Sequence, residues 1–332
     1  MMKKIAVLTS GGDAPAMNAA IRAITLSCNY HQLQCVGFYH GYNGLIDDQY
    51  VEMEHFDVNP TLQQGGTILK SARCQAMLTS EGVIQACNTL RKHEIDALIV
   101  IGGDGSLRGL QAIKQHWEKQ VIGLPGTIDN DLSGTDCTIG FATAVTTATH
   151  AIDKIRDTAN AFERIFIVEV MGRHSGHIAF NVGIATGAEA IISFENFSAD
   201  RALQKVTELL KAIDKQQHTH GSFLIVLAEN LWPGGAQALK ESLTEQGKVD
   251  SAICILGHIQ RGGSPVPEDR NLGTELGLAA VDAIITGQDN VMIGREAGKV
   301  IATPLEQVIN TAKPVSAHWV NAHQQQLTHY LK

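Results

Sequence analysis

Short apolar runs alternate along this chain with stretches in which apolar residues recur every three or four positions. The apolar runs have the length of β-strands and fall at residues 5–8, 35–39, 97–101, 121–124, 165–170, 189–193, 223–228 and 253–257. The stretches between them mostly have helical spacing, as Leu107, Leu110 and Ile113 show. Regular alternation of strands and helices predicts parallel strands with helices packed on the faces of the sheet. We therefore expect an α/β protein with doubly wound, largely parallel sheets.

Several predicted strands end shortly before a glycine or a polar side chain. These positions are Gly11, Asp104, Asp129, Arg173, Glu229 and His258. In doubly wound folds, ligands bind outside the carboxyl ends of the strands. The pattern therefore predicts that these residues contribute to one cleft.

The run Ile101-Gly102-Gly103-Asp104-Gly105-Ser106 lies at a predicted turn between a strand and a helix. Glycines let backbone N–H groups approach phosphate oxygens closely, and the start of the following helix favours negative charge. Asp104 places a carboxylate where Mg²⁺ could bridge phosphates, although an aspartate there could also cap the helix. We favour the metal role, so the run predicts a phosphoryl-transfer site.

A second run, Pro125-Gly126-Thr127-Ile128-Asp129-Asn130-Asp131, follows the apolar segment at 121–124. It carries two carboxylates, a hydroxyl and an amide. A carboxylate can accept the proton of an attacking hydroxyl, which makes this run suitable for activating a sugar.

Together, the two runs resemble the motifs of bacterial ATP-dependent 6-phosphofructokinases. The resemblance extends over nearly the whole chain, through residues 8–15, 71–73, 168–173 and 257–265. GGDG followed by Ser or Thr also occurs in NAD kinases and diacylglycerol kinases, so that motif alone indicates only a kinase. The other motifs remove this ambiguity.

The resemblance implies transfer of the ATP γ-phosphoryl group to the 1-hydroxyl of fructose 6-phosphate, which gives fructose 1,6-bisphosphate and ADP. It also implies two Rossmann-like three-layer domains built from discontinuous segments. Residues 1–138 with 252–306 would form the larger ATP-binding domain, and residues 139–251 with 307–332 the smaller sugar-phosphate domain.

The resemblance further implies a set of site residues. Asp129 would be the base, with Arg73 and Thr127 as further catalytic residues and Asp104 as the Mg²⁺ ligand. The ATP-binding residues would be Gly11, Arg73, Cys74, Gly103, Asp104, Gly105 and Ser106. Fructose 6-phosphate would meet Thr127, Ile128, Asp129, Arg164, Met171, Gly172, Arg173, Glu229, His258, Ile259, Gln260 and Arg261. Arg164 matches an arginine that enters a neighbouring subunit's site, so the resemblance implies a homotetramer with shared active sites.

The chain departs from the family pattern at three single positions and over residues 218–221, where His218-Thr219-His220-Gly221 replaces a lysine-rich stretch of the effector site. Cys74 replaces the usual Phe beside the adenine, and Ala252 replaces a second phosphate-binding arginine, which predicts weak sugar-phosphate binding unless Lys248 substitutes. Leu26 replaces one arginine of the effector site. The remaining effector-site residues would be Arg22, Arg156, Gly187 and Glu189.

Two alternatives remain beside the ATP-dependent enzyme. Pyrophosphate-dependent relatives commonly carry aspartate at the position of Gly105 and lysine at that of Gly126, so both glycines favour ATP. A non-catalytic regulatory subunit would account for Ala252 and the altered effector site. It would not need Asp104, Asp129 and Arg73 together.

Composition adds limits on partners and location. The chain has 332 residues and a net charge of −8, which gives no general attraction to nucleic acid or membranes. No apolar run approaches the length of a membrane span. The six cysteines form no CxxC pair, so we expect reduced thiols and a cytoplasmic location.

Overall fold

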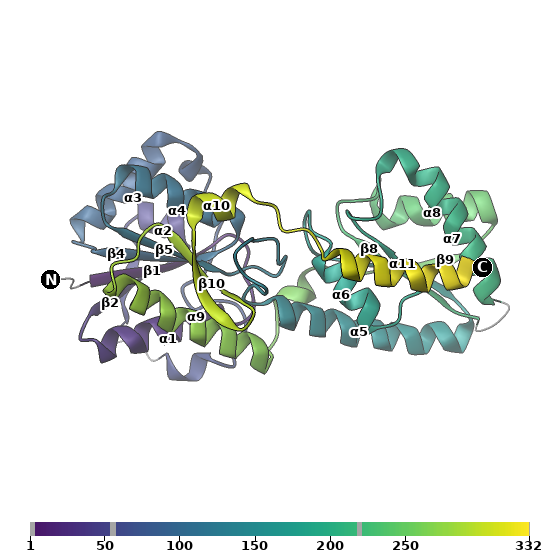
Figure 1. Cartoon of the computed structure of the whole chain (residues 1–332), viewed down its shortest axis with the longest axis horizontal. Coiled ribbons are helices and arrows are strands. Elements are labelled where there is room, and N and C mark those ends of the chain that lie inside the picture. Colours follow the sequence, from purple (N-terminus) through teal and green to yellow (C-terminus); the bar gives the residue numbers. More distant parts are fainter. Residues whose placement is uncertain (1–3, 54–57, 218–220, 332) are drawn as a thin grey trace. The chain divides into compact units, whose positions relative to one another are not determined.

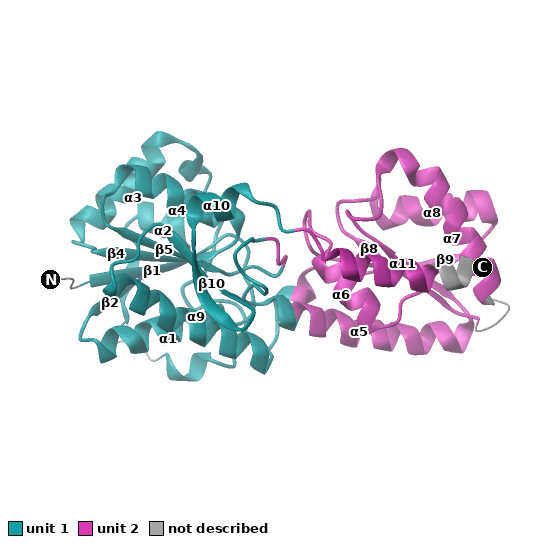
Figure 2. Ribbon diagram, viewed as in Figure 1, with its two compact units in different colours: residues 1–128, 132–143, 261–313 teal, residues 129–131, 144–260, 314–332 magenta. Residues whose placement is uncertain are grey.

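The structure is a computed structural model that describes residues 4–53, 58–217 and 221–331. The chain divides into two compact units, each assembled from three segments (Figure 2). Unit 1 contains residues 1–128, 132–143 and 261–313, and unit 2 contains residues 129–131, 144–260 and 314–332.

Unit 1 is built on a seven-stranded sheet. Its strands, in spatial order, are β11 (Lys299–Pro304), β10 (Val291–Glu296), β5 (Gln120–Pro125), β4 (Ala97–Gly102), β1 (Lys4–Ser10), β2 (Gln34–Phe38) and β3 (Tyr50–Glu52). The strands from β10 to β2 pair in parallel, whereas β11 and β3 pair antiparallel with their neighbours. The carboxyl ends of β1, β4 and β5 therefore meet at one edge of the sheet.

Helices cover both faces of this sheet (Figure 1). One face carries α1 (Met17–Tyr30) and α9 (Pro267–Ile285), and the other carries α2 (Tyr42–Ile46), α3 (Ser80–Lys92), α4 (Asp104–His116) and α10 (Leu305–Asn310). Two 3₁₀ turns lie at Asn59–Thr61 and Gln75–Leu78. Leu8 of β1 and Val100 of β4 are buried with Leu107 of α4 in one apolar core. Successive strand residues point to opposite faces, so the fully apolar strands can bury both sides.

Unit 2 has a smaller, fully parallel sheet in the order β7 (Ala190–Ile192), β8 (Phe223–Ala228), β6 (Ile165–Val170) and β9 (Ser251–Ile255). Its helices are α5 (Phe141–Phe162), α6 (His177–Ala185), α7 (Ala202–Gln217), α8 (Gly235–Gly247) and α11 (Ala317–Leu331), with 3₁₀ turns at Ala199–Arg201 and Gly257–Arg261. Ile167 and Ile225 of the sheet are buried with Leu209 of α7 and Leu239 of α8. This unit therefore has a core of its own.

The predicted α/β fold with largely parallel sheets is confirmed. All eight predicted strands are present. The edge strands β3 and β11 of the larger sheet, and β10 between β11 and β5, were not predicted. The domain boundary expected at residue 252 falls inside β9. Because β9 pairs with β6, that strand belongs to the smaller sheet, and the chain passes into unit 1 at Arg261.

No helix in the described part of the chain combines the length and the apolar character needed to cross a membrane.

His323 of α11 is a buried titratable group in unit 2. Its side chain is 1% exposed, and its Nε2 accepts a hydrogen bond of 3.0 Å from the backbone N–H of Ile191. Burial, followed by the nearby charge of Lys205, lowers the pKa of His323 from 6.5 to about 4. The imidazole is therefore neutral at pH 7, and protonating it opposes folding.

We expect acid to destabilise unit 2 through His323. Its folded pKa of about 4 lies below the value of 6.5 for the unfolded chain, so the unfolded state binds the proton more tightly. The stabilisation is complete above pH 6.5 and is lost as pH falls through 4, by about 3 kcal/mol. Urea unfolding at several pH values should show a smaller loss in His323→Gln than in the wild-type chain. His318→Gln, at an exposed position of the same helix, is the matched control, and equal pH dependence in all three proteins would contradict this assignment.

Candidate active site

The loop that follows β1 is held by the segment at residues 71–73. The backbone N–H of Gly11 donates to the carbonyl of Ala72 at 3.3 Å, and the hydroxyl of Ser71 donates to the carbonyl of Gly11 at 2.8 Å. Gly11 has a φ of +87°, a conformation that favours glycine. A Cβ at this position would lie 3.1 Å from the Ser106 hydroxyl, so three segments far apart in the sequence meet here.

The start of α4 forms the adjoining wall. Asp104 is the first residue of this helix and Gly103 is its N-cap. The carbonyl of Ser106 accepts a 2.6 Å hydrogen bond from the hydroxyl of Tyr42, whose pKa is raised well above 10.0 by burial. Unpaired backbone N–H groups and the helix dipole make such a helix start favourable for phosphate. The buried tyrosine fixes the first turn of that helix.

Asp104 is the residue of this wall that could hold a metal ion. Its side chain is 35% exposed, and its Oδ2 accepts a 3.0 Å hydrogen bond from Nε of Arg108. No group of three or more His, Cys, Asp or Glu residues with the geometry of a metal site occurs in the part of the chain that the structure describes. Mg²⁺ usually keeps several waters and takes one or two protein carboxylates, so a single exposed carboxylate beside a phosphate-binding helix start fits this ion.

Thr127 and Arg261 lie next to the glycine-rich loops of unit 1. A Cβ on Gly103 would meet the Thr127 Cβ at 3.4 Å. Arg261 donates from Nη1 to the carbonyl of Asp13 at 3.0 Å, and a Cβ on Gly12 would come within 2.7 Å of the same nitrogen. The loop after β1 therefore has a cation fixed against its backbone.

The guanidinium of Arg73 is exposed, while Cys74 packs against the edge of the unit 1 core. The Arg73 backbone continues the segment that holds Gly11. Arg73 thus directly follows Ala72, whose carbonyl accepts the hydrogen bond from Gly11. Cys74 contributes a partly buried thiol in place of an aromatic ring.

In unit 2, Asp129 is buried and anchored through its backbone. The hydroxyl of Ser175 donates to the carbonyl of Asp129 at 2.9 Å, and the same hydroxyl accepts from the backbone N–H of His177 at 3.3 Å. Asp129 is 7% exposed. The segment just before α6 thereby fixes the backbone of Asp129.

The loop after β6 is shaped by two polar side chains. Gly172 and Arg173 have positive φ values of +144° and +57°, and their backbone N–H groups donate to Oε1 of Glu229 at 3.2 and 2.7 Å. The amide of Gln260 accepts a 3.4 Å hydrogen bond from the N–H of Met171 and donates to the carbonyl of Gly257 at 3.1 Å. These contacts hold the loop in a conformation that would otherwise be unfavourable.

A second carboxylate lies near Glu229. Glu169 of β6 accepts a 3.2 Å hydrogen bond from the N–H of Ala236 at the start of α8. Burial raises the pKa of Glu169, and the charge of Glu229 raises it further. Glu169 thus ties the strand that precedes the loop to a neighbouring helix.

The predicted site residues fall in two groups. Unit 1 holds Gly11, Arg73, Cys74, Gly103, Asp104, Gly105, Ser106, Thr127, Ile128 and Arg261, and unit 2 holds Asp129, Arg164, Met171, Gly172, Arg173, Glu229, His258, Ile259 and Gln260. Gln260 is fully buried, whereas His258 and Ile259 are exposed. Both ends of the Gln260 amide bind backbone groups, so the observed role of this side chain is to organise the loop.

Three of the four predicted effector residues lie together. Arg156 donates from Nη1 to both carboxylate oxygens of Glu189, at 2.8 and 2.9 Å, and from Nη2 to the carbonyl of Gly187 at 2.9 Å. Glu189 also accepts from the N–H of Leu224 at 2.7 Å. Arg22 lies on α1 in unit 1.

Comparison with known proteins identifies the family. A family model described as Phosphofructokinase matches residues 4–284. The chain belongs to the phosphofructokinase family.

Curated phosphofructokinases match almost the whole chain. An "ATP-dependent 6-phosphofructokinase 2" of Bacteroides thetaiotaomicron is 47% identical over 321 residues, which is 96% of this chain and 97% of the relative. An "ATP-dependent 6-phosphofructokinase 1" of Thermus thermophilus is 46% identical over 315 residues, 95% of this chain and 96% of the relative.

Solved phosphofructokinases share the fold. A chain of Saccharomyces cerevisiae phosphofructokinase has a TM-score of 0.86 at 34% identity and covers 99% of this chain, which spans 48% of the yeast chain. A pyrophosphate-dependent phosphofructokinase from Marinobacter aquaeolei has a TM-score of 0.83 at 20% identity, over 99% of this chain and 92% of its own. At this lower identity the similarity shows the fold alone.

The sequence did not indicate several residues that shape this phosphofructokinase site. Tyr42, Ser175 and Asn18 are examples, and Asn18 binds the segment before Ser71 through Gln64 O at 3.1 Å and the N–H of Ile68 at 2.8 Å. The side chain of each residue forms a hydrogen bond with a backbone group more than 40 residues away in the chain. Tyr42 lies between Gly41 and Asn43, a pattern that is typical of a turn, so no local signal distinguishes it.

We expect Tyr42→Phe to destabilise unit 1 by about 1–2 kcal/mol, because the buried carbonyl of Ser106 loses its hydrogen-bond donor. Urea unfolding measures the loss. Tyr50→Phe is the control, since Tyr50 is 43% exposed. If the two variants lose equal stability, the bond to Ser106 has no special role.

Proposed function

We propose that this chain is an ATP-dependent 6-phosphofructokinase, which transfers the γ-phosphoryl group of ATP to the 1-hydroxyl of fructose 6-phosphate. The products are fructose 1,6-bisphosphate and ADP. The observation that carries the proposal is the meeting of Gly11, Ala72 and Ser106 beside the start of α4 in unit 1. The names of the curated relatives over nearly the full length support the same activity.

The nucleotide phosphates bind at the loop after β1 and at the start of α4. Gly11, Gly103, Gly105 and Ser106 supply close-approaching backbone and a hydroxyl. Arg73 stabilises the negative charge on the transferring group, since its guanidinium is permanently charged and can engage two oxygens. Asp104 would hold Mg²⁺, whose positive charge offsets that of the phosphates when it is bound.

Asp129 acts as the base. It accepts the proton of the 1-hydroxyl as that oxygen bonds to the γ-phosphorus, and the bond from phosphorus to the ADP oxygen breaks. Thr127 and Asp129 are separated by one residue in the chain. Covalent structure thereby links the nucleotide-binding side of unit 1 to the base.

The sugar phosphate is bound by Met171, Gly172 and Arg173 of the loop after β6, together with His258 and Ile259. Arg164 precedes β6, whereas Met171 follows it, and six residues of parallel strand span about 20 Å. One chain therefore places Arg164 far from its own Met171. This separation supports a homotetramer in which Arg164 serves a neighbouring subunit's site.

ATP is the phosphoryl donor that the glycines favour. A Cβ on Gly105 would meet no atom within 4 Å, so the space beside it is open for a nucleotide. A Cβ on Gly126 would come within 2.8 Å of the Ile101 side chain and 3.0 Å of Met17. A lysine at that position would require the core to shift.

The departures from the family pattern affect affinity and regulation within this proposal. Ala252 lies half-buried on β9 opposite Phe166, and exposed Lys248 ends α8 four residues earlier. With one arginine fewer, fructose 6-phosphate loses a charge-assisted bond of about 1.5–3 kcal/mol. The Arg156–Glu189 pair belongs to the proposed effector site. The proposal also places the protein in the cytoplasm.

We expect Asp129→Asn to lower kcat by about 10²–10⁴-fold, because the amide cannot accept the hydroxyl proton. The KM values for ATP and fructose 6-phosphate should change little, since the amide has the shape of the carboxylate. A coupled assay of fructose 1,6-bisphosphate formation measures both constants. Near-normal turnover in a folded variant would remove Asp129 from this role.

We expect Gly105→Asp to raise the KM for ATP by at least about tenfold, because a second carboxylate would lie beside the phosphates. The open space at this position predicts that the variant still folds. Gly105→Ala is the graded control, with a much smaller effect from a single methyl group. Equal KM values in all three proteins would place the nucleotide away from Gly105.

A further inference from the structure

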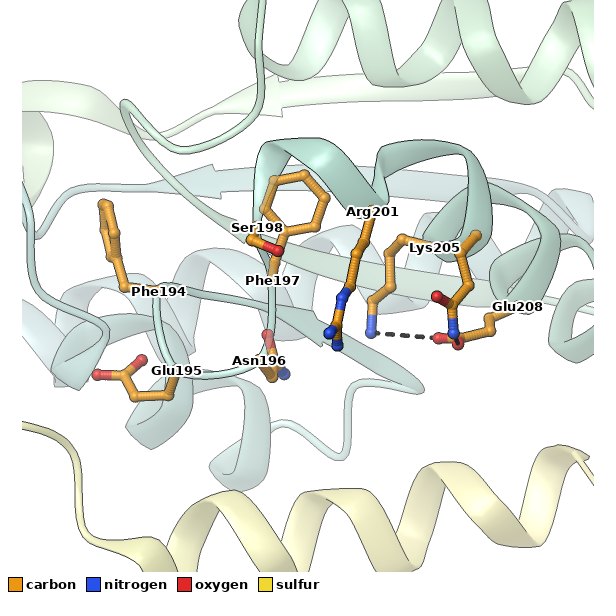
Figure 3. Close-up of a pocket in the computed structure, with 9 residues that line it drawn as sticks. Phe194, Glu195, Asn196, Phe197, Ser198, Arg201, Lys205 and Glu208 are labelled. Atoms are coloured by element: carbon orange, nitrogen blue, oxygen red, sulfur yellow. Dashed lines mark hydrogen bonds and ion pairs between the residues drawn. The ribbon is translucent and has the colours of Figure 1, made fainter.

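Unit 2 contains a pocket that none of the predicted site residues lines. It has a volume of about 440 Å³ and lies between the loop at residues 194–198, which follows β7, and the first turns of α7 (Figure 3). This volume lies within the usual range for pockets that bind small molecules. The pocket is formed entirely within unit 2.

Lys205 is the unusual group in this pocket. Its side chain is only 9% exposed, and among the described residues its ammonium makes no hydrogen bond. The Nζ of Lys205 forms a long ion pair with Oε2 of Glu208 at 3.8 Å, which is beyond hydrogen-bond distance (Figure 3). Burial lowers the pKa of Lys205, and His323 stays neutral beside it. A buried ammonium without hydrogen bonds is costly, which favours an anion as its partner.

The acidic and amide groups of the pocket already have partners. Glu195 accepts a 2.7 Å bond from the Ser193 hydroxyl and a 3.3 Å bond from the N–H of Val315. Asn196 accepts from the N–H of Ser193 at 2.9 Å and donates to the carbonyl of Ile191 at 2.9 Å.

Arg201 supplies a second cation. It lines the pocket, it is exposed, and no described residue forms a hydrogen bond or an ion pair with its guanidinium. The Oε1 of Glu208 accepts from the Gln204 amide at 3.0 Å. Of the charged groups in the pocket, the two cations therefore retain the most hydrogen-bonding capacity.

We propose that this pocket binds a small organic anion, with its phosphate or carboxylate group held by Lys205 and Arg201. Both cations suit such oxygens, and the guanidinium can bind two of them at once. The aromatic ring of Phe197 provides an apolar wall for the rest of the ligand. It is itself held by stacking on Trp232, with ring centroids 4.7 Å apart.

The walls of the pocket contact the loop that follows β6. Phe194 packs edge-on against His174, with centroids 6.2 Å apart, and a Cβ on Gly176 would lie 2.1 Å from the Glu195 carboxylate. His174 directly follows Arg173, a residue proposed to bind the sugar phosphate. A bound anion can thus act on this loop through direct contacts.

Labelling with pyridoxal 5′-phosphate tests the binding site in the full-length chain. Its aldehyde forms an imine with an unprotonated lysine amine and releases water, and borohydride reduces the imine to a stable amine that peptide mass spectrometry locates. We expect Lys205 to be labelled, and inorganic phosphate or malonate to protect it. At ten times the dissociation constant of the protecting anion, labelling should fall about tenfold. Stronger protection by phosphate or by malonate identifies the preferred group.

Arg201→Gln should weaken the protection of Lys205. Lys211→Gln, at an exposed position of the same helix and outside the pocket, is the matched control and should leave protection unchanged. No labelling of Lys205, or labelling that neither anion reduces, would overturn the proposal. Equal protection in the two variants would remove Arg201 from the site.

The effect on the loop rests on the proposed phosphofructokinase activity and has a separate test. Whichever of phosphate or malonate protects Lys205 should change the KM for fructose 6-phosphate by about fivefold or more in the wild-type chain, and less in Arg201→Gln. Identical responses in the two proteins would overturn the coupling. The labelling result does not depend on activity, so failure of the proposed enzyme function would remain distinguishable.

Discussion

The candidate site of unit 1 depends on the bonds that hold Gly11 between two other segments. The N–H of Gly11 binds Ala72, its carbonyl accepts the Ser71 hydroxyl, and its Cα faces the Ser106 hydroxyl. This arrangement needs a positive φ and leaves little room for a side chain, so a glycine is required at this point. Arg73 directly follows Ala72 in the chain, so its backbone lies next to the same loop. One backbone position thus brings together the loop after β1, the segment at residues 71–73 and the first turn of α4.

In unit 2, side chains hold the backbone of the loop after β6, whereas in unit 1 the loop after β1 is held at a glycine. Glu229 and Gln260 hold the backbone of residues 171–173, including two residues with positive φ. Sequence motifs place both side chains among the substrate contacts, but their observed bonds are to this backbone. The carboxylate of Glu229 accepts hydrogen bonds from the adjacent N–H groups of Gly172 and Arg173, and so fixes the backbone at these two residues. The observed role of Glu229 and Gln260 is therefore to shape this loop.

The sequence predicted the parts of this structure that have a local signal. Apolar runs predicted eight strands of the two sheets. The edge strands β3 and β11 were missed because they are mostly exposed, and β10 was missed because it has only three apolar residues before Gly294. The glycine-rich turn before α4 was also predictable, since its residues are adjacent in the chain. Tyr42 and Ser175 were not, because each binds backbone that is brought near only by the completed fold. For the same reason the sequence did not show which sheet β9 joins, because its place in the smaller sheet follows from its pairing with β6.

A chain with a net charge of −8 must bind anions through local groups, and pairing within the chain decides which cations are available. Arg156 is held by Glu189 through two short bonds, so a ligand there would compete with an existing carboxylate. Lys205 has only a long ion pair of 3.8 Å with Glu208, and the desolvation of its ammonium has already occurred on folding. An anion that reaches Lys205 therefore replaces no short protein bond. An anion would therefore displace fewer protein bonds in the pocket beside α7 than at the Arg156–Glu189 pair.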